Sequence, residues 1–329
     1  MQPAPRIVAR ATCCTSWLVP RVVHPGPPPV SSASPGLPRG LAVLGVGVLA
    51  ISSAAVLIVG SEAPPLVTAF WRVALSTVAM GAIAAVARMR GQRDAPSVAA
   101  RRSAIASGLC LGLHFYAWMA SLQLTSVATS TLLVTTTPIW VGLTAPWFTR
   151  EAPLSARGWA GLGVALGGGA LLVVAESSGG GADPAGAGLA ILGAWCAAAY
   201  LMFGKQARQQ MSLATYATWA NGAAAVLLAT LALATDTALL PLSTQTWWMV
   251  LGLALVPQLI GHNSLLWAVR YVDASLVSVV VLLEPVGATL LAWLVFGAPP
   301  TGVEVLGGAI LLVGVTLVVR ARARTRAKT

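Results

Sequence analysis

One stretch of the chain reads ASLVSVVVLLEPVGATLLAWLVF from Ala274 to Phe296. It is apolar except for hydroxyl groups, the indole of Trp293 and a single carboxyl, that of Glu284. A helix needs about 20 mainly apolar residues to cross the hydrocarbon core of a bilayer. The stretch therefore predicts a transmembrane helix that carries one acid near its middle, followed directly by Pro285.

The composition of the whole chain also indicates a membrane protein. Charged residues make up 9% of the 329 residues and hydrophobic residues 57%, and the mean hydropathy is +0.81. Globular chains carry about 25% charged residues, so a soluble fold of this size could not cover its apolar surface. We predict an all-α polytopic membrane protein with ten transmembrane helices, at residues 41–60, 66–87, 104–124, 127–148, 158–175, 187–204, 213–234, 246–268, 274–296 and 302–319.

The basic residues fall on one side of this predicted topology. If the first helix leaves the cytoplasm, nineteen of the 20 Lys and Arg residues lie in the tails and connections of the inner side, and none lies in an outer connection. Lys and Arg near helix ends resist translocation, so such a bias sets the orientation. We expect a multi-pass protein of the cell (inner) membrane with both termini in the cytoplasm. The net charge of +11 then reflects topology rather than nucleic-acid binding, which needs a basic soluble face.

The chain divides into two apolar halves between two polar tails. Residues 1–39 contain many prolines and no sustained apolar run, so we expect a disordered cytoplasmic tail, or a stretch upstream of the true start, rather than a cleaved signal peptide. The halves are expected at residues 40–176 and 185–320. A basic cytoplasmic tail at 321–329 ends the chain.

The two halves contain an internal repeat. Residues 132–173 align with residues 279–319 at an offset of 147, which changes to 146 after one gap. Matched pairs at special backbone positions are Pro138 with Pro285, Pro153 with Pro299, Gly161 with Gly307 and Gly168 with Gly314. Because each half has five predicted helices, an odd number, the second half must insert upside down. Inverted repeats of this kind place the substrate site of many secondary transporters near the midplane between the halves.

Two parts of the second half resemble a known family. The run from Ala268 to Pro300 and the run GGAILLVG at 307–314 resemble the second EamA repeat of the drug/metabolite transporter superfamily. Phe70-Trp-Arg72 and the segment from Pro138 to Pro153 resemble the first repeat. The resemblance covers about residues 41–320. It implies a helical bundle with a central cavity, and export of small metabolites, amino acids or drugs.

The chain departs from the family pattern at one place. The family usually has Gly-Glu before the last helix, where this chain reads Gly297-Ala-Pro-Pro. We interpret that family acid as structural or gating. Its loss leaves the expected fold unchanged and concerns only the gating.

Two ionisable side chains lie inside predicted membrane helices, where such groups are costly and mark functional sites. Glu284 is central in its helix, and Pro285 removes a backbone hydrogen bond beside it. We expect Glu284 to contact substrate or carry a proton, the alternative being a permanently protonated structural acid. Arg72 lies about 9 Å inside the outer end of its helix. It is expected to reach the interface as an anchor, to bind an anionic substrate group, or to pair with Glu284.

Further polar and aromatic side chains fall in the middle of several predicted helices. His114 and Trp118 share a helix face by their spacing, as do Gln258 and His262. The other members of this set are Thr137, Trp195, Tyr200, Asn221 and Asn263. Together they predict a site for substrate binding or coupling in one cavity, although each alone is more typical of hydrogen bonding between helices. Gly163 and Gly167 predict an ordinary helix-packing face.

The motifs exclude several classes of function. The chain has no Walker-type loop, no HExxH and no GxSxG, and its four cysteines lack metal or redox spacing, so we expect no cofactor, no metal and no enzyme activity. We predict a secondary transporter of a small molecule that works by alternating access in the lipid bilayer, with proton coupling or exchange as candidate modes. The alternatives are an uncoupled facilitator or channel, and a non-transporting sensor or scaffold. The oligomeric state is open, a homodimer being one option.

Overall fold

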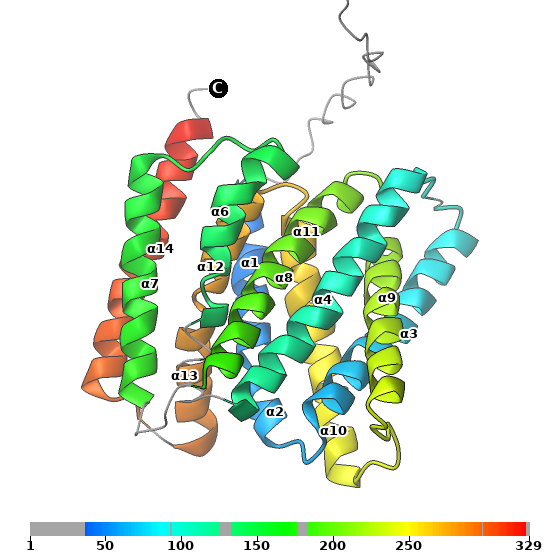
Figure 1. The fold of residues 1–329 in the computed structure, drawn as a ribbon. Helices are drawn as coiled ribbons and strands as arrows, with labels where there is room; N and C mark the ends of the chain where they lie inside the picture. Colours follow the sequence, from blue (N-terminus) through cyan, green and yellow to red (C-terminus); the bar gives the residue numbers. More distant parts are fainter. Residues whose placement is uncertain are drawn as a thin grey trace, which may run out of the picture. The chain divides into compact units, whose positions relative to one another are not determined.

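The computed structural model describes residues 37–92, 94–124, 130, 133–176, 183–297 and 299–326, and every regular element in these ranges is a helix. The helices are α1 (Leu37–Ser52), α2 (Ala54–Val59), α3 (Pro65–Met89), α4 (Val98–Leu124), α6 (Thr137–Phe148), α7 (Ala156–Glu176), α8 (Pro184–Arg208), α9 (Leu213–Ala234), α10 (Thr244–Leu253), the π-helix η1 (Ala254–His262), α11 (Asn263–Ala268), α12 (Ala274–Val281), α13 (Glu284–Phe296) and α14 (Gly302–Arg326) (Figure 1). Of the predicted tail at 1–39, residues 1–36 lie outside the described residues, and 37–39 begin α1.

Seven helical stretches in the described part are long and apolar enough to cross a membrane. They are Pro65–Met89, Val98–Leu124, Pro184–Arg208, Leu213–Ala234, Thr244–Ala268, Ala274–Leu291 and Gly302–Arg324. Each coincides with a predicted span. The predicted spans at 41–60, 127–148 and 158–175 are not in this set, so the all-helical class is confirmed and the count of ten stays a prediction. The first of these three is divided at Ser53, and the second includes residues outside the described ranges.

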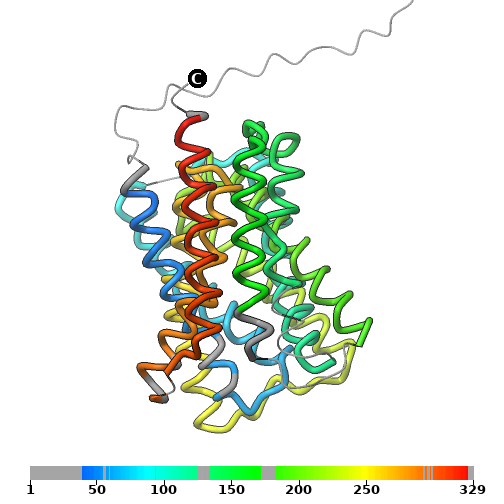
Figure 2. Tube along the Cα trace, turned by 90° about the vertical axis from the view of Figure 1, so that its left-hand side faces the viewer, coloured from blue at the N-terminus to red at the C-terminus, as the bar shows by residue number. Residues whose placement is uncertain are grey.

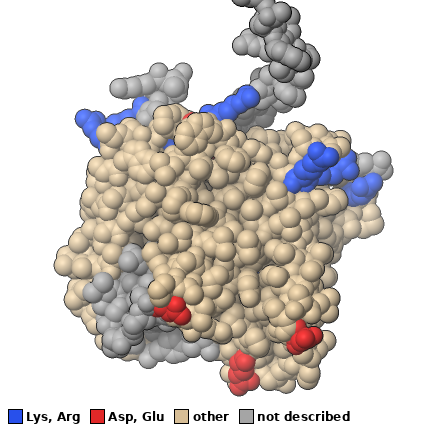
Figure 3. Space-filling view, viewed as in Figure 1, with Lys and Arg blue, Asp and Glu red and all other residues tan. Residues whose placement is uncertain are grey.

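Charge is segregated along the helix direction. On the face shown in Figure 3, Lys and Arg lie at the end where the C-terminus is drawn, and Asp and Glu lie toward the opposite end. We call these the basic end and the acidic end. Arg88 and Arg90 at the end of α3 belong to the basic end, whereas Glu62 and Asp236 lie in connections of the acidic end.

Two helix starts repeat in the two halves. α13 begins at Glu284 with Pro285 in its first turn, after a break in the helix, and α6 begins one residue before Pro138. The residues that precede these helices are 147 apart and have nearly the same backbone: φ −76°, ψ −8° at Leu283 and φ −71°, ψ −4° at Thr136. Proline suits the first turn of a helix because an N–H there has no partner to lose. The internal repeat therefore extends to backbone geometry.

α7 and α14 pack closely through glycines that the repeat aligns, and they lie side by side in both views (Figures 1 and 2). A Cβ on Gly168 would collide with the backbone of Leu311, and a Cβ on Gly314 would collide with the backbone of Ala165. At the offset of 146, Gly168 matches Gly314 and Ala165 matches Leu311. The two contacts are thus the same contact with the halves exchanged, as across a two-fold axis.

The packing face predicted at Gly163 and Gly167 is wrong. A Cβ at either position would meet nothing within 4 Å, whereas one on Gly161 would lie 2.9 Å from Cβ of Leu317. Gly161 and Gly168 are seven residues apart and share a face of the helix, and this face meets α14. Gly163 and Gly167 lie on other sides of α7.

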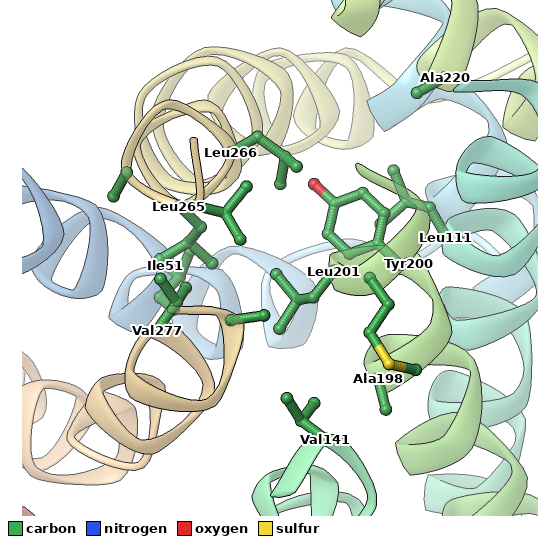
Figure 4. Close-up of a cluster of buried hydrophobic side chains, with 14 of the residues drawn as sticks. Ile51, Leu111, Val141, Ala198, Tyr200, Leu201, Ala220, Leu265, Leu266 and Val277 are labelled. Carbon is green, nitrogen blue, oxygen red and sulfur yellow. The ribbon is translucent and has the colours of Figure 1, made fainter. Parts of the chain in front are cut away.

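The buried apolar core includes residues from helices far apart in the sequence (Figure 4). Ile51 of α1, Val141 of α6, Leu201 of α8, Leu266 of α11 and Val277 of α12 all belong to it. Every residue of α12 from Ala274 to Val280 is buried, on all sides of the helix. In α13, by contrast, Leu290 and Leu294 are exposed. The half of this span toward the basic end is therefore enclosed by other helices.

Candidate functional site

A chain of buried hydrogen bonds connects α3, η1 and α9. Arg72 Nε donates to Gln258 Oε1 at 2.9 Å, and Gln258 Nε2 donates to Asn221 Oδ1 at 3.0 Å. Asn221 Nδ2 in turn donates to Ser76 Oγ at 3.0 Å. All four side chains are buried. Their hydrogen bonds hold the Arg72 guanidinium in one place inside the bundle.

The backbone around Gln258 is irregular. η1 is a π-helix with Pro257 inside it. Proline has no N–H to donate, so it disturbs a regular α-helical ladder. π-helical turns inside α-helices are frequent at functional sites. Pro257 is the residue in the sequence that indicates this distortion, and the distortion is not among the features predicted above.

Arg72 lies against an aromatic group rather than at the membrane interface. Its Cζ is 4.1 Å from the centroid of the Phe115 ring, a cation–π distance. The Phe115 ring stands edge-on to His262, at 5.3 Å between centroids, and His262 lies 6.0 Å from Tyr200. Arg72 and Glu284, both within the described part, are not within ion-pair distance, but their charges attract each other inside the bundle. Because Arg72 is buried, it does not anchor its helix at the membrane interface.

His114 and Trp118 extend this group along α4. Their rings are nearly parallel, with an interplanar angle of 9° and 6.3 Å between centroids, and His114 is 5.3 Å from Phe115. His114 Nδ1 is 2.9 Å from the carbonyl of Gly193, so this nitrogen carries the proton and donates. We call Arg72, His114, Phe115, Trp118, Tyr200 and His262 the aromatic–arginine cluster.

Two buried polar atoms of the cluster have no hydrogen-bond partner within the described ranges. They are Nε1 of Trp118 and Nδ1 of His262. A buried polar group without a partner costs about 1–3 kcal/mol, and native structures rarely leave one unsatisfied. Both atoms are therefore free to bind a group from outside the protein.

Glu284 lies half-buried at the break between α12 and α13. Its carboxyl makes no hydrogen bond or ion pair with another described residue, whereas its backbone carbonyl accepts from Ser52 Oγ at 3.0 Å. Ser52 also donates to the carbonyl of Val48 at 2.8 Å. The backbone at Glu284 is thus tied to the end of α1, and the carboxyl has no hydrogen-bond partner among the described residues, with the charge of Arg72 nearby.

The remaining predicted site residues lie in other surroundings. Thr137 Oγ1 donates to the carbonyl of Ala194 at 3.3 Å, which ties α6 to α8. Asn263 Nδ2 contacts the sulfur of Met80 at 3.5 Å. Trp195 is 50% exposed and packs edge-on against Trp140. These three residues are not part of the aromatic–arginine cluster.

Two residues of the site, Phe115 and Ser76, are not among those predicted from the sequence. Phe115 directly follows His114, and nothing in its spacing distinguishes it from the other apolar residues of its helix. Ser76 lies four residues after Arg72 and so shares its helix face, a spacing that could have found it.

Comparisons with known proteins agree with this architecture. The model of the EamA-like transporter family matches residues 40–174 and 184–320, which is two copies over most of the chain. Among solved structures, 29 chains match. One of them, described only as "Crystal structure of protein", has a TM-score of 0.72 and 19% sequence identity, over 87% of this chain and 99% of that chain. Its likeness shows the fold alone. No curated protein matches the chain.

Proposed function

The chain belongs to the EamA-like transporter family, and from this premise we propose that it is a secondary transporter that exports a small metabolite, an amino acid or a drug-like solute by alternating access. A transporter of the drug/metabolite superfamily contacts lipid on its outside and a small solute within. In the proposed topology ten helices form two inverted five-helix repeats, at 40–176 and 185–320, around a central cavity. The paired helix starts before Pro138 and Pro285, and the exchanged glycine contacts of α7 and α14, support the inversion.

The carboxyl of Glu284, which accepts no hydrogen bond from another described residue, carries the proposal. It lies at a helix break inside a membrane-spanning stretch. An acid at such a position costs free energy, and acids of this kind mark the pathways of ions or solutes. Broken helices with free backbone groups are typical of the substrate and coupling sites of secondary transporters. We therefore assign substrate contact or proton coupling to Glu284.

The aromatic–arginine cluster supplies the other groups that a solute needs. Arg72, held by Gln258, offers a fixed positive charge, and Trp118 Nε1 offers a free N–H donor. Phe115 and Tyr200 add apolar ring faces. Such a set suits a small solute that has both an apolar body and polar groups. Thr137, Trp195 and Asn263 contribute to this site less directly, through the helices that they connect or cover.

The enclosed α12 favours a gated transporter over the open-channel alternative. An open channel needs a continuous polar path, and the basic-end half of the span 274–296 is surrounded by apolar side chains (Figure 4). A cavity that opens to one side at a time agrees better with this packing. The segregated Lys and Arg support the proposed orientation, with the basic end and both termini in the cytoplasm. A reporter fused to the C-terminus tests that orientation.

A thermal-shift screen of the purified protein against a metabolite library tests the site. Any ligand that raises the unfolding temperature of the wild type is expected to bind about tenfold more weakly to Trp118→Phe, which removes the N–H and keeps a smaller aromatic ring, since a good hydrogen bond is worth about 1–1.5 kcal/mol. Glu304→Gln, at a partly exposed acid near the start of α14, is the control. Equal affinities of wild type and Trp118→Phe for every hit would remove Trp118 from the site.

A further inference from the structure

Glu151 lies in the connection between α6 and α7 at the basic end, and it is only 8% exposed. Its Oε1 accepts from Lys205 Nζ at 2.7 Å and from the backbone N–H of Ala274 at 2.7 Å. Its Oε2 accepts from Ser275 Oγ at 3.1 Å and from the Ser275 N–H at 3.4 Å. A carboxylate is favourable at the N-terminus of a helix. Glu151 therefore caps α12 from a distant part of the chain.

Every one of these bonds joins the two halves of the molecule. Glu151 belongs to the first matched repeat, and Lys205, Ala274 and Ser275 belong to the second. Lys205 Nζ donates in addition to the carbonyl of Val272 at 3.2 Å. A neighbouring bond across the halves runs from Gln206 Nε2 to the carbonyl of Phe148 at 2.9 Å. Arg322 Nη1, in the continuation of α14 beyond the second repeat, donates to the carbonyl of Ala152 at 2.6 Å.

The acidic end lacks the residues for a matching ion pair. In the sequence, the segments 60–65, 125–136, 177–183, 235–243 and 297–301, which link helices whose described termini lie at that end, contain no Lys, Arg or His. The counterpart of the Glu151 segment reads Gly297-Ala-Pro-Pro and has no acid. The next acid, Glu304, accepts from the backbone N–H of Thr301 at the start of its own helix. At the acidic end the described residues join the halves by hydrogen bonds and not by an ion pair: Ser243 Oγ donates to Glu62 Oε2 at 2.9 Å, Gln245 Nε2 to the carbonyl of Gly60 at 3.1 Å and Trp71 Nε1 to the carbonyl of Leu239 at 3.0 Å.

We propose that Glu151, Lys205 and the N-terminus of α12 form a latch that holds the basic ends of the two halves together. Opening the basic end requires α12 to move away from α6 and α8, and the latch bonds must break for this to happen. Because the described residues of the acidic end join the halves by hydrogen bonds without an ion pair, the latch makes the conformation closed at the basic end the resting one. This proposal rests on the proposed function, since it assigns the latch to a transport cycle.

The labelling rate of a cysteine introduced at a buried position can test the latch without any substrate. Val277 lies in the enclosed α12 and is fully buried, so Val277→Cys should react slowly with a membrane-impermeant maleimide. The reporter is placed in protein in which the native cysteines are replaced, namely Cys13, Cys14, Cys110 and Cys196. The protein is reconstituted in lipid nanodiscs, which leave both ends accessible to the reagent.

Loss of the latch is expected to expose the reporter. Glu151→Gln and Lys205→Met should each raise the labelling rate about tenfold or more, because removing one partner of a buried charge pair is strongly destabilising. Lys205→Arg, which keeps the charge, and Glu304→Gln, the same acid-to-amide change at the other end, should leave the rate near that of the parent. Ser275→Ala removes one bond to Glu151 and should give a smaller increase, which provides a reading if the stronger variants fold poorly.

The labelling result separates the latch from the proposed function. An unchanged rate in Glu151→Gln, Lys205→Met and Ser275→Ala, in monodisperse protein, would overturn the latch even if the protein transports solutes. Faster labelling in a protein that transports none of the ligands found by thermal shift would support the latch and count against the proposed function.

Discussion

At Glu151, burial and charge pairing act on the carboxyl in opposite directions. Burial alone would raise the pKa, but the Lys205 ammonium and the hydrogen bonds from Lys205, Ala274 and Ser275 hold the pKa below its ordinary value of 4.5. The fold therefore favours the ionised carboxylate. Its contribution to stability is fully present above the ordinary pKa and is lost as the pH falls through the lowered folded pKa.

The lowered pKa of Glu151 predicts how Glu151→Gln changes the pH dependence of stability. The variant should unfold more easily than the wild type by about 1–3 kcal/mol near pH 7, because a buried charge partner is lost. The difference should stay constant down to about pH 5 and shrink below pH 4.5 as the wild-type carboxylate takes up its proton. Thermal unfolding in detergent from pH 7 to pH 4 measures it. A difference that does not vary with pH would contradict the assigned charge state.

The sequence shows which polar residues lie in apolar helices, but it does not show which residues they contact. Arg72, Gln258 and Asn221 stood out as polar groups in apolar helices, but the sequence did not reveal that they bond to one another. Periodicity places a residue on a face of its own helix and says nothing of the depth or rotation of the neighbouring helix. Trp195, chosen by the same reasoning, is half-exposed beside Trp140.

At the scale of elements, hydropathy predicted most helices and missed where they break. The sequence has no proline or glycine at Ser53 that would indicate the break between α1 and α2. α3 and α14 extend beyond their predicted ends at the basic end, because Arg-rich segments continue the helix after its apolar part. The special backbone geometry at Pro138 and Pro285 could be predicted from the sequence, since proline restricts the backbone wherever it occurs.

The glycine packing of α7 against α14 gives a matched pair of substitutions. Gly168→Ala should destabilise the protein by about 1–3 kcal/mol, because its Cβ would collide with the Leu311 backbone. Gly163→Ala should be neutral or stabilise by up to about 1 kcal/mol, since its Cβ meets nothing and alanine is the better helix former. Thermal unfolding of both variants checks the contrast. The reverse order of stabilities would show that the two helices pack by another face.

At the scale of the whole molecule, the two halves are alike in backbone and unlike in charge. The contact of Gly168 with Leu311 returns with the halves exchanged as the contact of Gly314 with Ala165. The pair of Glu151 with Lys205 at the basic end has no counterpart in the sequence of the acidic end. In the transport cycle that we propose, similar halves provide two related conformations, and the unequal charge makes one of them the more stable. The internal repeat could be read from the sequence, but the contacts between its copies could not.

The most direct measurement of the central claim is solute flux in proteoliposomes containing wild type, Glu284→Gln or Glu304→Gln. The solute is a ligand found by thermal shift, and flux is measured from pH 5.5 to pH 8.5 with and without an imposed proton gradient. We expect wild type and Glu304→Gln to transport with the same pH dependence. Glu284→Gln should lose at least about 90% of the flux or lose its pH dependence, because the amide cannot exchange a proton. Flux through Glu284→Gln with the rate and pH profile of the wild type would contradict the assignment of this carboxyl to the transport site.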